Sequence, residues 1–172
     1  MIKSLPPILD RWPLVALLAS AAMLAIAHGF ERFGGLAPCT LCLRQREVYW
    51  VAGAIALAGV AVTRLGAPRT WQSLVNAALA LTFAVGVGFA VYHAGAEWKF
   101  WPGPAACASG GGGPVSLEDL AGLMGGEPVK APACDQAAWV FAGLSMAGWN
   151  AVISAGLMGL SLAAAGRRRA RT

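Results

Sequence analysis

Four cysteines carry the clearest chemistry in this sequence. Cys39 and Cys42 form a CxxC motif, and Cys107 and Cys134 lie 27 positions apart in a segment rich in proline and glycine. CxxC thiols commonly have a lowered pKa and exchange readily, whereas a segment rich in Pro and Gly has little regular structure and can move. A tethered pair beside a mobile pair is the arrangement that a disulfide relay requires.

The cysteines have two other interpretations. Both pairs could be inert structural disulfides, although the small ring of a CxxC disulfide contributes little loop entropy. The four thiolates could instead bind zinc, but such a site favours a second closely spaced pair, and Cys107 and Cys134 are far apart in sequence. We therefore predict that the cysteines are catalytic and that none binds a metal. The predicted catalytic cysteines are Cys39, Cys42, Cys107 and Cys134.

A cation follows the CxxC motif at helical spacing. Arg46 lies four residues after Cys42, so the two side chains share one face if a helix has begun. A fixed guanidinium favours the Cys42 thiolate, and it stabilises negative charge on a carbonyl oxygen when a quinone is reduced. Arg46 is therefore a predicted catalytic residue. It could also be an interfacial arginine that reaches toward solvent, which is the role we expect for Arg44.

One histidine, His93, closes the third apolar stretch directly after Tyr92. A lone histidine at a membrane interface is most often a polar tip. It could instead donate a hydrogen bond to the second oxygen of a quinone bound beside Arg46. We therefore assign Cys42, Arg46 and His93 to a predicted quinone site.

Membrane-spanning helices are needed to position these residues. The chain has 172 residues, of which 58% are hydrophobic and 12% are charged, whereas a soluble domain usually has about 25% charged residues. A membrane-spanning helix needs about 20 mostly apolar residues, and the uncharged stretches predict helices near 13–31, 45–64, 71–92 and 145–165. We therefore predict an all-α membrane protein, a single domain over 1–172 built as a four-helix bundle.

Basic residues predict how these helices are oriented. Eight of the 13 Lys and Arg residues fall on the side that holds both termini, and five fall on the other side. The positive-inside rule then places both termini in the cytoplasm and the periplasmic segments at about 32–44 and 93–144, with all cysteines outside. Because the basic residues flank apolar stretches, no nucleic-acid partner is predicted. Alternatively, Ala25-Ile26-Ala27 could be the cleavage site of a signal peptide.

The second periplasmic segment contains one helical pattern. Ser116 and Asp119 have the spacing of a capping box, and Leu117, Leu120 and Met124 belong to the apolar stripe that follows. This pattern predicts a short amphipathic helix lying on the membrane. A small helix packed on the bundle is the alternative.

Several motifs together resemble the disulfide bond formation protein B (DsbB) family. The first is Pro38-Cys39-Thr-Leu-Cys42-Leu-Arg-Gln-Arg46, which looks like that family's CxxC motif with an arginine four residues later. Similar stretches are Tyr92–Glu97, Trp101–Cys107, Cys134–Asp135 and Trp149–Asn150. The resemblance spans nearly the whole chain. A CxxC alone would be weak, whereas its combination with this arginine, four spans and two outward cysteines is specific.

The resemblance implies a quinone-reducing protein-disulfide oxidoreductase of the bacterial inner membrane. It implies that Cys107 forms a mixed disulfide with the periplasmic thiol oxidase DsbA and that Cys134 is its partner. It also implies that Cys39 and Cys42 reoxidise that pair, with Cys42 nearest a bound ubiquinone or menaquinone. The partners would then be a periplasmic DsbA-like oxidase, membrane lipid and quinone, and the activity would support disulfide bond formation in exported proteins.

Arg46 and His93 fall where the quinone-contacting residues of that family lie. Two features depart from the family pattern: Arg44 adds a second cation near the motif, and the run Gly110–Gly113 lies close to Cys107. These departures bear on kinetics and partner choice rather than on the reaction class.

Two rival functions fit the residues. A quinone reductase of similar size would pass electrons in the opposite sense, and sequence physics does not settle the direction. A non-catalytic membrane scaffold would use both disulfides as staples. We expect no Asp or Glu within the spans, which argues against a proton pump or an ion pathway.

Overall fold

The computed structural model describes residues 7–104 and 134–169. In chain order its elements are η1 (Pro7–Arg11), α1 (Trp12–Gly34), α2 (Thr40–Arg64), α3 (Arg69–Glu97), β1 (Val140–Phe141), β2 (Leu144–Ser145) and α5 (Met146–Arg169). Within the described residues, four helices are long and apolar enough to cross a membrane. The predicted four-helix membrane bundle is therefore confirmed. The predicted amphipathic helix near Ser116 lies outside the described residues, as does Cys107.

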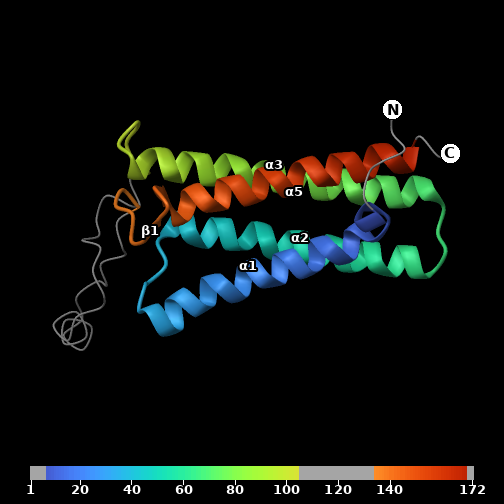
Figure 1. Cartoon of the computed structure of the whole chain (residues 1–172), viewed down its shortest axis with the longest axis horizontal. Coiled ribbons are helices and arrows are strands. Elements are labelled where there is room, and N and C mark those ends of the chain that lie inside the picture. The colour runs from blue at the N-terminus through green and yellow to red at the C-terminus, as the bar shows by residue number, and fades with distance from the viewer. Residues whose placement is uncertain (1–6, 105–133, 170–172) are drawn as a thin grey trace.

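The four long helices run lengthwise beside one another (Figure 1). α3 packs most extensively against α5, and α2 packs against both α1 and α3. η1, the C-terminal end of α5 and the turn from α2 to α3 lie at one end of the bundle, while the start of α2, the end of α3 and β1 lie at the other (Figure 1). The CxxC motif is therefore separated from η1 and from the C-terminal end of α5 by the full length of the bundle (Figure 1).

Two helix boundaries differ from the prediction by five residues, and both differences place the motifs on helices. α2 begins at Thr40 rather than near residue 45, because Cys39 is its N-cap and accepts a hydrogen bond from the Cys42 backbone N–H. α3 continues to Glu97 rather than ending near 92, and its last turns are buried from His93 onward. The segments between α1 and α2 and between α3 and α5 are correspondingly shorter than predicted.

A short hairpin leads into the last helix, and the sequence did not predict it. Val140 pairs with Ser145 and Phe141 with Leu144 in antiparallel register. The two turn residues, Ala142 and Gly143, both have positive φ angles, of 49° and 79°. Two-residue hairpin turns of this kind match the twist of the strands. The hairpin sets the position of Ser145 directly before α5.

The core is built from small residues and a few large side chains. Trp12, Leu79 and Phe83 are fully buried, and the Trp12 indole donates a 2.9 Å hydrogen bond to Ser161 Oγ, which connects α1 to α5. Between α1, α2 and α3 the backbones come close at Gly59. A Cβ at this position would lie 2.6 Å from Val75 Cγ1 and 2.9 Å from Pro13 Cβ. Close backbone approach replaces the hydrophobic effect as the source of helix association in lipid.

Gly59→Ala is expected to destabilise the protein, because the added methyl group must displace α1 or α3; overpacking of this kind typically costs about 1–3 kcal/mol. The measurement is the thermal unfolding midpoint in detergent. Gly53→Ala is the matched control on the same helix, since a Cβ there meets nothing within 4 Å. Equal midpoints for the two variants would contradict the close packing at Gly59.

Candidate active site

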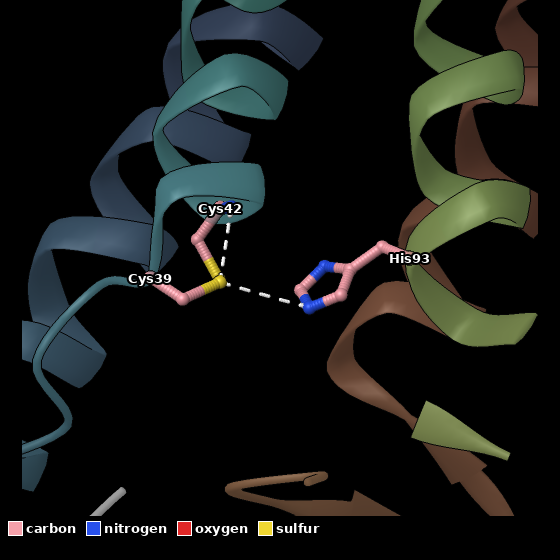
Figure 2. Close-up of side chains that lie close together, drawn as sticks. All are labelled: Cys39, Cys42 and His93. Carbon is pink, nitrogen blue, oxygen red and sulfur yellow. Dashed lines mark hydrogen bonds between the residues drawn. The ribbon is translucent and has the colours of Figure 1, made fainter. Parts of the chain in front are cut away.

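Cys39 lies where the N-terminus of α2 meets the end of α3. Its sulfur accepts the Cys42 backbone N–H at 3.3 Å, lies 2.8 Å from Cys42 Sγ and is 3.6 Å from His93 Nε2. Figure 2 shows the Cys39 sulfur between Cys42 on α2 and the His93 ring, which reaches across from α3. Cys39 and His93 are both buried. The structure therefore brings three predicted site residues together.

These contacts favour the Cys39 thiolate. A hydrogen bond from Cys42 is the main effect that lowers the pKa of Cys39, the His93 ring lowers it further, and burial opposes both. The helix N-terminus also favours a negative charge at this position. Cys39 is thus the sulfur around which donors converge, whereas the sequence directed attention to Cys42.

Cys134 packs directly against the CxxC motif. It is fully buried in one cluster with Cys39 and Leu41, and Cys42 contacts the same cluster. Cys134 is disulfide-bonded, whereas Cys39 and Cys42 are free thiols. Three of the predicted catalytic cysteines therefore share one site.

An ion pair fixes the segment that follows Cys134. Lys99 Nζ, just beyond the end of α3, lies 2.5 Å from the Asp135 carboxylate. The Lys99 ammonium is also the main reason that the pKa of Asp135 is lowered. This contact ties the residue next to Cys134 to the end of α3, near His93.

Arg46 points toward α1. Its guanidinium donates to Glu31 at 2.5 Å and to the Ala27 carbonyl at 3.1 Å, and its side chain is 15% exposed. Arg44 instead pairs with Glu47 at the surface, and its side chain is 58% exposed. The different environments agree with the different roles expected for the two arginines. Whether Arg46 acts on the Cys42 thiolate stays a prediction.

A cavity of about 140 Å³ adjoins the CxxC motif. Its polar wall includes Cys42, Arg46 and His93, and α1 contributes the largest share of its apolar wall, including Ile26 and Phe30. A closed cavity of roughly 150 Å³ accommodates a benzene ring in an engineered protein interior. Ile26 is 54% exposed on the outer face of the bundle, so the apolar wall reaches the surface that faces lipid. The cavity therefore suits a ring-sized head group attached to an apolar tail.

Sequence reasoning missed several buried polar residues around this cavity. Gln45 and Asn150 line it beside His93, and Glu97 lies 3.7 Å from His93 Nε2 while accepting a hydrogen bond from Ser145. The sequence could have indicated these residues, because they are polar side chains within apolar helices and such residues in membrane spans are usually functional.

The helix bounds also revise an expectation about acidic residues. Glu31, Glu47 and Glu97 all lie within helices. The expectation that the spans contain no acid is therefore wrong at their outer ends, and Glu97 is buried there.

The same sulfur and nitrogen atoms could hold a soft metal ion. Ligand atoms of Cys39, Cys42 and His93 all lie within 4.8 Å of one another. Thiolate and imidazole ligands are those preferred by Zn²⁺ and Cu⁺. The prediction that the site functions without a metal stays a prediction.

Comparisons with known proteins identify the family of this chain. A sequence model of the family described as "Disulfide bond formation protein DsbB" matches residues 10–164. The chain is 32% identical over 161 residues to a Disulfide bond formation protein B from Marinobacter nauticus, covering 89% of this chain and 90% of the relative. Proteins of the same name from Dechloromonas aromatica and Verminephrobacter eiseniae are 31% and 30% identical, covering 92% and 95% of this chain and 92% and 93% of the relatives. No solved structure matches the chain significantly. This chain, a helical membrane bundle that is matched over nearly its full length, thus belongs to the disulfide bond formation protein DsbB family.

Proposed function

We propose that this protein reoxidises a periplasmic DsbA-like thiol oxidase and passes the electrons to ubiquinone or menaquinone in the bacterial inner membrane. Membership of a disulfide bond formation family supports the thiol oxidoreductase activity. The observation that carries the quinone assignment is the cavity, because one wall holds Cys42 and Arg46 and the other is apolar and reaches the lipid-facing surface. A lipid-soluble oxidant can enter such a cavity from the side and meet the dithiol.

Electrons would enter through the wider cysteine pair. A partner thiolate attacks the Cys107–Cys134 disulfide at Cys107 and forms a mixed disulfide, and Cys134 leaves as a thiolate. The second partner thiol then displaces Cys107, so the partner is oxidised and the pair is reduced by two electrons. Exchange with the Cys39–Cys42 disulfide next oxidises the wider pair and leaves Cys39 and Cys42 as thiols. The packing of Cys134 against Cys39 supports this exchange, since the sulfurs need little movement to meet.

Closing the Cys39–Cys42 disulfide releases two electrons and two protons. A bound quinone supplies an acceptor for both. Arg46 would hold one carbonyl oxygen, His93 would line the cavity beside the quinone ring, and the apolar side chains of α1 would contact the tail. Arg46 also donates to Glu31 and to a backbone carbonyl, which holds its guanidinium beside the cavity.

The orientation follows from the same proposal. The cysteine end of the bundle would face the periplasm, where disulfides persist. The end that holds η1, the α2–α3 turn and the end of α5 would face the cytoplasm, and it carries Arg11, Arg64, Arg69 and Arg167. This distribution satisfies the positive-inside rule.

Cys42→Ser is expected to lower quinone reduction by at least about 100-fold, because Cys39 cannot form the disulfide that releases the electrons without Cys42. The assay follows quinone absorbance after reduced DsbA-like partner is added to purified protein. The variant must keep the wild-type unfolding midpoint. Normal turnover would rule out a relay through the CxxC motif.

Arg46→Met is expected to raise the KM for a short-chain quinone about tenfold or more, since hydrogen bonds from a charged group contribute about 1.5–3 kcal/mol. Arg44→Met is the matched control, and its KM should stay within about twofold of wild type because exposed ion pairs contribute little. The double variant Glu31→Gln/Arg46→Met tests whether an unpaired Glu31 causes the loss. Full recovery in the double variant would contradict a direct role of Arg46.

The lowered pKa of Cys39 predicts its reactivity with iodoacetamide. A thiol with an ordinary pKa of about 8.5 loses reactivity steadily below that pH. In the reduced protein, Cys39 should keep its alkylation rate down to pH 6 and lose it only in more acidic solution, as the pH falls through its lowered pKa. Peptide mass spectrometry measures the rate at Cys39. Cys42→Ala removes the main donor and should move the profile to higher pH; an unchanged profile would contradict the assigned cause.

A further inference from the structure

A chain of buried hydrogen bonds runs from His93 into the bundle, beyond the contacts that the proposed relay uses. Gln45 Nε2 lies 2.8 Å from His93 Nδ1, and Gln45 Oε1 accepts a hydrogen bond from Asn150. Tyr49 donates to Asn150 Oδ1, and Ser154 Oγ lies 3.0 Å from the Tyr49 hydroxyl. All five side chains are buried, and they come from α2, α3 and α5.

In this series of hydrogen bonds, each side chain donates to the next one in the direction of His93. The single hydroxyl hydrogen of Tyr49 is given to Asn150, so Ser154 must donate to Tyr49. Asn150 then uses its NH₂ group on Gln45 Oε1, which leaves the Gln45 NH₂ group facing His93 Nδ1. An amide NH₂ group can only donate, so Nδ1 must accept and the ring hydrogen lies on Nε2.

The other edge of the ring supports the same arrangement. His93 Nε2 faces two acceptors, Cys39 Sγ at 3.6 Å and Glu97 Oε1 at 3.7 Å. Glu97 is held there because its other oxygen accepts from Ser145, whose hydroxyl oxygen in turn accepts the Gly148 backbone N–H. If the side-chain amides of Gln45 and Asn150 were both reversed, His93 Nδ1 would carry the ring hydrogen. The Nε2 lone pair would then face a thiolate and a carboxylate. The opposite direction is therefore electrostatically unfavourable.

We propose that Gln45 and Asn150 are positioning residues that hold His93 as its Nε2–H tautomer. In this tautomer His93 directs its ring hydrogen at the Cys39 sulfur and stabilises the thiolate that disulfide exchange requires. The catalytic consequence rests on the proposed function, but the tautomer does not, because it follows from the buried contacts alone. A neutral ring held by a buried partner at one nitrogen is a common way to set the role of the other nitrogen.

The tautomer can be measured directly in the full-length, reduced protein. The chain contains two histidines, so ¹⁵N-histidine labelling of a His28→Gln variant leaves His93 as the single labelled ring. Long-range ¹H–¹⁵N spectra in detergent micelles at neutral pH are expected to show a protonated Nε2 and an unprotonated Nδ1. In Gln45→Glu the carboxylate can only accept, so Nδ1 should become protonated. Protonated Nδ1 in the parent protein, or unchanged ring signals in Gln45→Glu, would overturn the proposal.

A matched pair of glutamines separates positioning from general packing. Gln45→Leu removes the donor to Nδ1, and alkylation of Cys39 near pH 4, close to its lowered pKa, should slow by about threefold or more, since a one-unit rise in pKa there lowers the thiolate fraction about fivefold. Gln72→Leu is the control, because Gln72 is buried at the opposite end of α3 and donates to the Ala67 carbonyl. Equal slowing in both variants would contradict a specific role for Gln45. Slowed quinone turnover in Gln45→Leu with unchanged ring signals and alkylation would likewise refute the positioning role while leaving the proposed function intact.

Discussion

Polar atoms inside a membrane bundle must satisfy one another, because lipid offers no hydrogen bonds. At the cysteine end, the Cys39 sulfur provides a hydrogen-bonding partner for polar groups on two helices. Cys39 caps the first turn of α2 through its side chain, and the same sulfur meets the His93 ring from α3. One atom is therefore both a structural cap and the proposed redox centre. The start of α2, the end of α3 and the reactive thiol cannot be positioned independently.

The remaining helices complete the site in different ways. α1 contributes the largest share of the apolar wall of the cavity, and Glu31 on this helix holds the Arg46 guanidinium close to it. α5 contributes Asn150 behind the histidine, and the hairpin before α5 places Ser145 against Glu97. The cavity is thus polar on the side of the dithiol and apolar on the side of the lipid. Such a division suits a ligand that is itself part polar ring and part hydrocarbon.

Polar residues near helix ends explain where the sequence interpretation was incomplete. Arg44 to Glu47 and His93 to Glu97 were expected to lie at or beyond the helix ends, whereas they belong to α2 and α3. They remain helical because they find partners on other helices, as Gln45 does with His93 and Arg46 with Glu31. Such pairings join residues about 15 to 48 positions apart, so no local pattern reveals them.

Hydropathy and motif spacing were sufficient to establish the membrane class, the four helices and the CxxC motif with its neighbouring arginine, because each depends on residues close together in the chain. The sequence also predicted His93 and Cys134 as site residues without showing how they meet the motif. Packing was needed to bring Cys134 and His93 against Cys39 and to reveal Gln45, Glu97 and Asn150 around them. The physical reason is that a buried polar side chain needs a hydrogen-bonding partner. These side chains find their partners on other helices, so the partners are known only once the helices are packed together.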